Sequence, residues 1–118
     1  ASDIRAEGNI VATGEVTAYS DARLKHDITP TSPALDKLRK IEVVDYNMIG
    51  DRQERRRTGV IAQQILPIFP QMVEGNESDY YTVNYPKLVT VAIKAIQELS
   101  DRVDKLEKIL KENGITQD

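Results

Sequence analysis

The residues best suited to chemistry in this sequence are a serine and a lysine near its N-terminal end. Ser20 and Lys25 lie five positions apart in the stretch S-D-A-R-L-K, which opens with two turn-forming residues. A serine hydroxyl becomes an effective nucleophile when a base removes its proton, and a lysine amine can do so once burial or a nearby cation lowers its pKa below the usual value of about 10.4. The nearest electrophile is the carbonyl group of Tyr19. Attack there would give an ester that water hydrolyses, which would leave Ser20 as a new N-terminus.

Few other groups in the chain can assist such a serine. Asp21, or backbone N–H groups near it, could orient the hydroxyl or hold the developing oxyanion. The sequence has no cysteine and a single histidine, His26, which excludes thiolate chemistry and disfavours a Ser/His/Asp triad or a His-rich metal site. We therefore expect neither a metal nor a cofactor. Ser and Lys at this spacing also occur in ordinary polar turns, so the pair alone leaves that interpretation open.

Composition indicates burial between subunits and argues against two classes of partner. The 118 residues are 40% hydrophobic, yet they include one Phe and no Trp, the large side chains that usually fill a monomer core. A formal net charge of -3 disfavours nucleic acid, because phosphate binding needs clustered positive charge. No run approaches the roughly 18 apolar residues of a membrane span, and the first residues lack the pattern of a signal peptide. We expect neither nucleic acid nor a membrane as a partner.

The stretch before the serine has the alternation of a β-strand with one buried face. Between Gly8 and Tyr19, small apolar residues fall at even spacing, namely Ile10, Ala12, Val16 and Ala18. Small inward side chains suit strands from several chains wrapped on one axis, so this segment is predicted to end a fibrous β-stem; a flexible linker is the alternative. A second short strand is expected from Leu24 to Ile28, which puts a turn at Ser20 between two strands.

The middle of the chain alternates helical and β-rich segments. Ser32 is expected to cap a helix that has Pro33 in its first position and ends near Lys40. The other predicted elements are a β-hairpin of residues 43–48 and 58–62, a short helix at 63–68, and strands at 72–73 and 80–85. The arginines at 55–57 could bind an anion, but two acidic residues lie beside them, so a solvated hairpin tip is favoured.

The longest periodic segment runs from Pro86 to Asn113 and has the heptad pattern of a coiled coil. Its a positions are Val89, Ile96, Val103 and Leu110, and its d positions are Ala92, Leu99 and Leu106. Arg102 at a g position and Glu107 at the next e position can pair between parallel helices. This seam permits dimers as well as trimers, so it leaves the oligomer number undecided. An amphipathic helix that packs only on its own domain is the alternative.

Four parts of the sequence together resemble one known family. The stretches S-D-A-R-L-K-H-D-I-T-P, G-V-I-A-Q-Q and Y-T-V-N-Y, followed by the heptad helix, are similar to the C-terminal intramolecular chaperone auto-processing domain of phage tail spikes and fibres, of the endosialidase type. The resemblance covers about residues 14–113, and its most specific element is the pattern S-[DN]-x-x-x-K. It implies a homotrimer that helps to fold the preceding β-stem and is released by cleavage immediately before the serine.

Carried over by position, the resemblance implies roles for individual residues. Ser20 is the nucleophile, Lys25 its base and Asp21 a supporting residue, while Gln63 or Gln64 in G-V-I-A-Q-Q is a further candidate for support of the site. The family also includes membrane-tethered transcription factors that release themselves after trimerising. The fibre-like stem and the lack of a membrane span in this sequence favour a phage protein.

The sequence therefore predicts an α+β fold in an intertwined homotrimer, with a small α/β part between a β-stem and a three-stranded parallel coiled coil. Residues 1–19 would end the stem, and residues 20–118 would be a self-cleaving serine endopeptidase module whose coiled-coil helix covers residues 86–113. Its partners would be its own copies and the upstream fibre or spike stem. The module would act in the host cytoplasm during virion assembly and leave the mature tail fibre after cleavage.

Three other functions compete with this prediction. A purely structural trimerisation tip would fold the stem without cutting. A receptor-binding tip would need an exposed pocket or aromatic patch, and Tyr80, Tyr81 and Tyr85 are explained more simply as packing residues of a strand and a helix start. A conventional enzyme acting on small molecules is disfavoured, because the sequence has no cofactor motif and no paired carboxylates in a predicted cleft.

Overall fold

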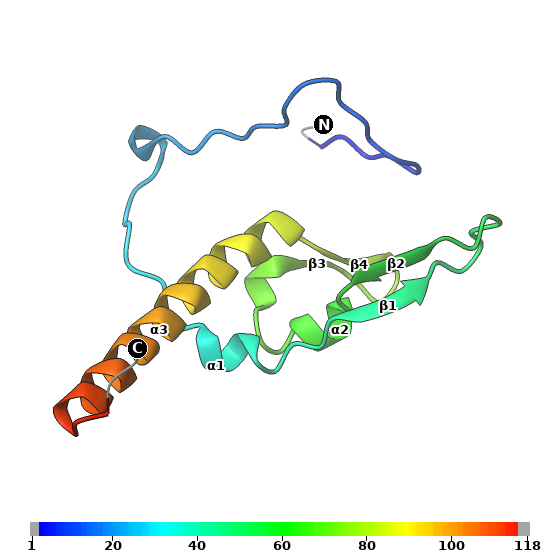
Figure 1. Cartoon of the computed structure of the whole chain (residues 1–118). Coiled ribbons are helices and arrows are strands. Elements are labelled where there is room, and N and C mark those ends of the chain that lie inside the picture. The colour runs from blue at the N-terminus through cyan, green and yellow to red at the C-terminus, as the bar shows by residue number, and fades with distance from the viewer. Residues whose placement is uncertain (1–2, 116–118) are drawn as a thin grey trace. The chain divides into compact units, whose positions relative to one another are not determined.

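The structure, a computed structural model, describes residues 3–115. The chain divides at Pro30 into two compact units, and Figure 1 shows the course of the backbone through both. Within residues 3–30, the 3-10 helix η1, Ala22–Leu24, is the single regular element. The second unit holds all other helices and strands of the described chain.

The two strands predicted around Ser20 do not form within residues 3–30. Leu24 belongs to η1, and Asp27 has a left-handed backbone with φ of 54°, so the predicted strand from Leu24 to Ile28 is wrong. Residues 8–19 form no strand in this single chain either. A strand needs a neighbour for its backbone N–H and C=O groups, and in a fibrous stem that neighbour belongs to another copy. The β-stem therefore stays a prediction.

The second unit is a small α+β fold, which confirms the fold class at that level. Its helices are α1 (Leu35–Leu38), α2 (Ala62–Ile65) and α3 (Tyr85–Glu112), with the 3-10 helix η2 (Pro70–Met72) after α2. Two antiparallel hairpins pair β1 (Val44–Asn47) with β2 (Arg56–Gly59) and β3 (Val73–Asn76) with β4 (Tyr80–Val83). In Figure 1 both hairpins and α2 lie near the N-terminal half of α3, and the C-terminal half of α3 extends away from them.

The first hairpin has the expected solvated tip, and one acidic side chain organises it. Asp51 is only 8% exposed at its side chain and accepts hydrogen bonds from the N–H groups of Gln53 (3.1 Å) and Arg55 (3.2 Å). Its Oδ2 atom also lies 3.3 Å from Arg55 Nε and 3.6 Å from Arg57 Nη2. The arginines of the tip are therefore engaged within the hairpin, as the solvated-tip interpretation requires.

Helix α1 begins later than predicted and is capped from outside its own segment. It starts at Leu35 rather than Pro33, and its own N-cap residue, Ala34, makes no capping side-chain hydrogen bond. The carboxylate of Glu98 in α3 takes that place, because Oε2 accepts hydrogen bonds from the N–H groups of Ala34 (2.9 Å) and Leu35 (2.8 Å). The predicted cap at Ser32 is wrong, since a carboxylate distant in sequence satisfies the free N–H groups instead.

The hydrophobic core of the second unit is small. Its buried members come from α2, η2, α3 and the residues just before α1 and η2, namely Ala34, Ile65, Phe69, Met72 and Val91. The chain exposes 10957 Å² of surface in total, whereas a folded monomer of 13.3 kDa exposes about 6,450 Å² by the usual size scaling. A single copy thus leaves much surface uncovered, and burial of that surface between subunits stays a prediction.

Helix α3 has two different apolar faces. Leu88, Val91 and Ala95, at g, c and g positions of the heptad, face the core, and Val91 and Ala95 are only 5% and 3% exposed. The a and d seam lies about 90° around the helix from this face, at 100° per residue. Of the seven seam residues only Ala92 is partly covered, and the other six are exposed, from 37% at Leu110 to 66% at Ile96. Helix α3 can therefore pack on its own unit and still present the seam to other copies.

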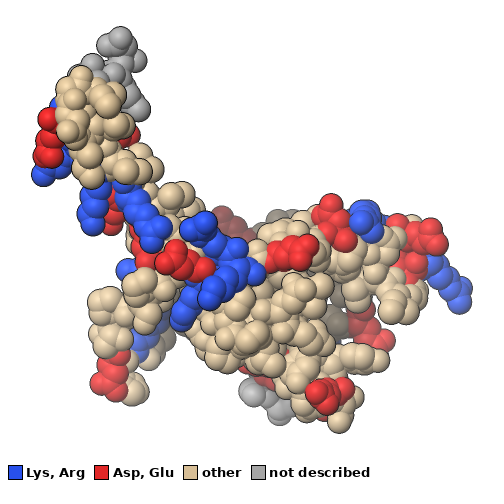
Figure 2. Space-filling model, turned by 90° about the horizontal axis from the view of Figure 1, so that it is seen from below, with Lys and Arg blue, Asp and Glu red and all other residues tan. Residues whose placement is uncertain are grey.

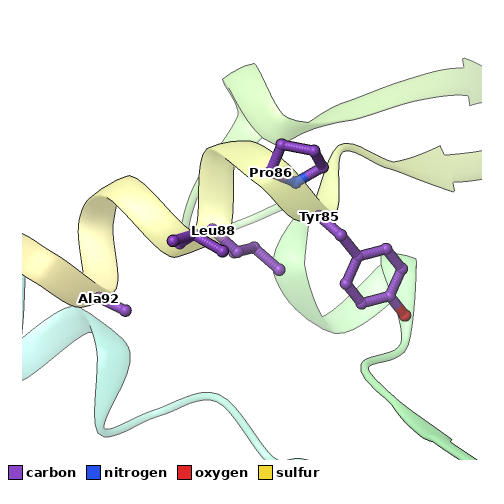
Figure 3. A pocket seen from close by; sticks show the side chains of 5 residues that line it. Tyr85, Pro86, Leu88 and Ala92 are labelled. Atoms are coloured by element: carbon purple, nitrogen blue, oxygen red, sulfur yellow. The ribbon is translucent and has the colours of Figure 1, made fainter. Parts of the chain in front are cut away.

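The seam opens onto a pocket at the first turns of α3. Asn84 caps the helix by accepting a hydrogen bond from the N–H group of Lys87 at 3.1 Å. An open pocket of about 700 Å³ lies beside these turns, lined by Tyr85, Pro86, Leu88, Val89 and Ala92 (Figure 3). Val89 and Ala92 are the first a and d residues, so the pocket continues the exposed seam.

The charged side chains of the molecule leave wide uncharged areas between them. Figure 2 shows uncharged side chains covering broad parts of one face, between groups of acidic and basic residues. Among residues 3–115, no helix is long and apolar enough to cross a membrane.

Candidate functional site

Asp21 builds the turn that joins Ser20 to Lys25. Its backbone is extended, with φ of -66° and ψ of 133°, and its side chain accepts a hydrogen bond from the N–H group of Arg23 at 2.9 Å, as an N-cap residue does. The backbone closes the turn with bonds from Leu24 N–H to the Asp21 carbonyl (3.0 Å) and from Lys25 N–H to the Ala22 carbonyl (3.1 Å). The main chain is thereby folded so that Lys25 can reach back to Ser20.

The two groups that could carry out the chemistry are in direct contact. Lys25 Nζ donates a hydrogen bond to Ser20 Oγ at 2.7 Å. Both residues belong to the first unit, so the contact is local to one turn of one chain. A neutral amine in the same place could accept the proton of the hydroxyl across this distance, which is the arrangement that general-base activation requires.

A salt bridge between Arg23 and Asp21 keeps both side chains charged. Arg23 Nε lies 3.1 and 3.2 Å from the two carboxylate oxygens of Asp21, and Arg23 Nη2 lies 2.8 Å from Oδ2. The side-chain hydrogen bond from Arg23, helped by its backbone N–H group, lowers the pKa of Asp21 below the usual 3.8. The same bond raises the pKa of Arg23. Asp21 therefore acts here as a charged part of the turn, and a permanent cation stands two residues from Lys25.

The site is open to water in a single chain. Ser20 and Lys25 are exposed, and Tyr19, the residue before Ser20, is 95% exposed. A shallow hollow of about 390 Å³ beside the turn is lined by Tyr19, Asp21, Arg23 and Leu24. Water at this position weakens electrostatic interactions, so the lone chain holds the reacting groups together without the dry surroundings that favour acyl chemistry.

The remaining titratable groups near the turn pair with each other. His26 Nδ1 lies 2.9 Å from Asp27 Oδ2, and both side chains are 91% exposed. Over the part of the chain that the structure describes, no group of three or more His, Cys, Asp or Glu side chains is arranged to hold a metal ion.

Gln63 and Gln64, the other residues proposed for support, lie in α2 of the second unit. Both side chains are exposed, and Gln63 lines a groove between the two hairpins. Their predicted support of Ser20 stays a prediction, because they belong to a different unit of the chain.

Two residues with clear structural roles were not identified from the sequence. Arg23 could have been found, because an acidic residue and an arginine two positions apart across a turn are well placed to pair. Glu98 carries no such signal, since it lies 64 residues from its partner Ala34 and its heptad position c is normally solvated.

The turn opens a region that is shared with known proteins. Residues 20–74 match the model of a peptidase family described as chaperone of endosialidase. The chain belongs to this family. The match begins at Ser20 itself and continues through β1, β2 and α2 to Glu74 in β3.

Three curated relatives cover most of this chain. The long tail fiber protein Gp37 of Enterobacteria phage K3 is 32% identical over 98 residues, 77% of this chain and 8% of that protein. The probable tail fiber protein of Escherichia phage Phieco32 is 38% identical over 99 residues, 79% of this chain and 14% of the relative. Myelin regulatory factor homolog 1 of Caenorhabditis elegans is 33% identical over 115 residues, 89% of this chain and 12% of the relative. The chain thus spans a small part of each of these longer proteins.

Proposed function

We propose that this chain is the chaperone module of a tail fibre or spike, which trimerises, helps to fold the β-stem before it and then cuts itself off between Tyr19 and Ser20. The observation that carries the proposal is the 2.7 Å contact between Lys25 Nζ and Ser20 Oγ. It occurs at the first residue of the family match, the residue that cleavage would make a new N-terminus. Two of the relatives are named as tail fibre proteins, which supports a virion protein as the setting.

The reaction would proceed in two steps on the chain itself. Lys25 takes the hydroxyl proton of Ser20, and Oγ attacks the carbonyl carbon of Tyr19. The C–N bond then breaks, the nitrogen of Ser20 receives the proton from Lys25, and an ester joins Tyr19 to Oγ. Water hydrolyses this ester, which restores the hydroxyl group and leaves a carboxylate on Tyr19. Serine and electrophile are neighbours in one chain, so proximity supplies much of the rate.

Trimer formation would switch this reaction on. The exposed seam of α3 supplies the association surface, and in the proposed trimer other copies cover the open turn. Removing water from an amine disfavours its charged form, so the neutral form that can accept the serine proton would become populated. The monomer would then be protected from premature cutting.

The test is to express the chain and follow its mass. Intact mass spectrometry and a denaturing gel should reveal a product that begins at Ser20 and lacks residues 1–19. Ser20→Ala and Lys25→Ala should remain whole while still forming trimers. His26→Ala is the matched control, because it changes an exposed polar residue next to Lys25 and should leave cleavage at the wild-type rate.

Two results would contradict the proposal in different ways. A wild-type trimer that stays whole over days would make the chain a structural trimerisation tip that folds the stem without cutting. Cleavage of Lys25→Ala at the wild-type rate would remove Lys25 from the role of base and leave Ser20 with another activator.

A receptor-binding tip has one observation in its favour. A groove of about 620 Å³ runs between the hairpins, and tyrosines line it, namely Tyr46, Tyr80, Tyr81 and Tyr85. Tyr80 is 85% exposed, so packing within the chain does not explain it, contrary to the sequence-based interpretation. An uncut wild-type chain that binds cell-surface carbohydrate, and loses that binding in Tyr80→Ala, would favour this second function.

A further inference from the structure

The N-terminus of α1 is held by a single side chain of the heptad helix. Glu98 Oε2 accepts hydrogen bonds from Ala34 N–H at 2.9 Å and Leu35 N–H at 2.8 Å, and Oε1 lies 3.2 Å from the same Ala34 nitrogen. These bonds are part-buried and join positions more than sixty residues apart in the sequence. A carboxylate that accepts several N–H groups makes stronger hydrogen bonds than a neutral acceptor.

Apart from the packing of Ala34 in the core, helix α1 has no strong local contact that fixes its start. It contains four residues, which is too short to be stable alone, and its own N-cap residue makes no side-chain bond. One turn further along α3, Arg102 Nη2 lies 3.6 Å from Asp36 Oδ1, between side chains that are 55% and 74% exposed. This exposed pair contributes little, so Glu98 is the main polar attachment of α1 to α3.

The helix that carries Glu98 also carries the seam. Glu98 occupies heptad position c and Leu99 the adjacent d position, so packing of Leu99 between copies would fix the direction in which Glu98 points. The start of α1 would then have a set position relative to the trimer axis. In a lone chain nothing covers the seam, so the direction of Glu98 relative to a trimer axis is not yet set.

The Ser20 turn is joined to this anchor by a short stretch of chain that contains two prolines. Nine residue steps separate Lys25 from Ala34, a reach of at most about 32 Å when fully extended. Pro30 and Pro33 lie in this connection, and each fixes its own φ and restricts the residue before it. The tether therefore limits where the Ser20 turn can lie once the start of α1 is fixed.

We propose that Glu98 is a positioning residue for self-cleavage: by anchoring the start of α1 on the seam-bearing helix, it transmits trimer assembly to the Ser20 and Lys25 turn. This inference rests on the proposed self-cleavage and adds to it the element that couples assembly to the cut. Glu98 does not touch the reacting atoms. Its loss should slow cutting within trimers that are otherwise intact.

The experiment compares cleavage rates in purified trimers of matched variants. Glu98→Ala removes the anchor and should lower the first-order rate per trimer by about tenfold or more, the size expected for a lost charge-assisted hydrogen bond. Glu98→Gln keeps the length and one acceptor oxygen, so it should recover part of the rate. Glu112→Gln is the control, because Glu112 occupies the same heptad position two heptads later, on an exposed part of α3, and should cut like the wild type.

A second control separates positioning from mere stability. Val91→Ala removes two methyl groups from the core face of the same helix and should lower the unfolding temperature without changing the rate per trimer. If Glu98→Ala yields no trimer, the rates of Glu98→Gln and Glu98→Asp trimers decide, because aspartate is one methylene too short to hold both N–H groups.

Each possible result either supports the role of Glu98 or contradicts it. Slower cutting in Glu98→Ala or Glu98→Asp trimers, with partial recovery in Glu98→Gln, supports the inference. Wild-type rates in all three overturn it and leave the proposed self-cleavage standing. A wild-type trimer that never cuts overturns the self-cleavage, and the role of Glu98 with it.

Discussion

Replacing one seam residue should separate assembly from cutting. Leu99 occupies a d position and keeps 51% of its surface exposed in the single chain. Full burial of a leucine is worth about 1.5–3 kcal/mol, so covering the exposed half in a trimer contributes about 1 kcal/mol per chain and about 3 kcal/mol for three chains. In Leu99→Asp this free energy of burial is lost, and three carboxylates that repel one another are placed in the same layer of the seam. Lost burial alone lowers the association constant roughly 100-fold, and the charges lower it further.

Two measurements on the same samples check this prediction. Sedimentation equilibrium should find Leu99→Asp monomeric at concentrations where the wild type is trimeric, and a denaturing gel should find it uncut. Gln97→Asp is the control, because it makes the same change in charge at an exposed b position and should assemble and cut normally. A monomeric Leu99→Asp that cuts at the wild-type rate would refute the coupling of assembly to cleavage. A trimeric Leu99→Asp would refute the seam instead.

Three further predictions concern single contacts. Gly59→Ala should lower the free energy of unfolding by about 1–3 kcal/mol. Its added Cβ would lie 2.5 Å from Tyr85 Oη, so Tyr85→Phe in that background should recover part of the loss in denaturant unfolding. The carboxyl group of Asp21 should titrate below the usual 3.8 by NMR, because its pKa is lowered, and Arg23→Gln should raise that midpoint. A depressed folded pKa stabilises the turn above about pH 4, and this stabilisation should disappear as the pH falls through the folded pKa; unchanged amide shifts there would contradict it. Asp51→Ala should speed hydrogen exchange at the two N–H groups that Asp51 holds, and unchanged exchange would rule out its role in the hairpin tip.

The proximity of Ser20 and Lys25 could be predicted from the sequence because it is local. Ser20 and Lys25 lie in one turn, and residue types at short spacing decide whether a turn forms. The same reasoning failed for the stretch from Leu24 to Ile28, which overlaps this turn. Leu24 and Ile28 suggested a strand by alternation alone, but the Asp21 cap drew Leu24 into η1, and Asp27 adopted a left-handed backbone. An alternating pattern of only a few residues does not decide the local structure when a side-chain cap stabilises a different one.

In the second unit, periodic and paired segments were predicted well, and contacts distant in sequence were not. The first hairpin and the long helix α3 follow from β-rich runs and a heptad pattern, and both lie within a few residues of their expected bounds. The start of α1 was misplaced because Ser32 and Pro33 form a familiar capping pattern, whereas the actual cap, Glu98, comes from a distant helix. The groove beside Tyr80 was missed because it needs both hairpins to form.

The two faces of α3 also determine which of its residues are free to change over evolution. In the proposed trimer, positions a and d up to Arg102 face other copies and positions c and g face the core and α1, so four of every seven residues have an assigned neighbour. Positions b, e and f have none in this scheme, and sequence drift should concentrate there. Past Arg102 the described chain provides no core against α3, and positions c and g join the variable set. Diverging members of the family should therefore keep two stripes on the first half of this helix and a single stripe on the second.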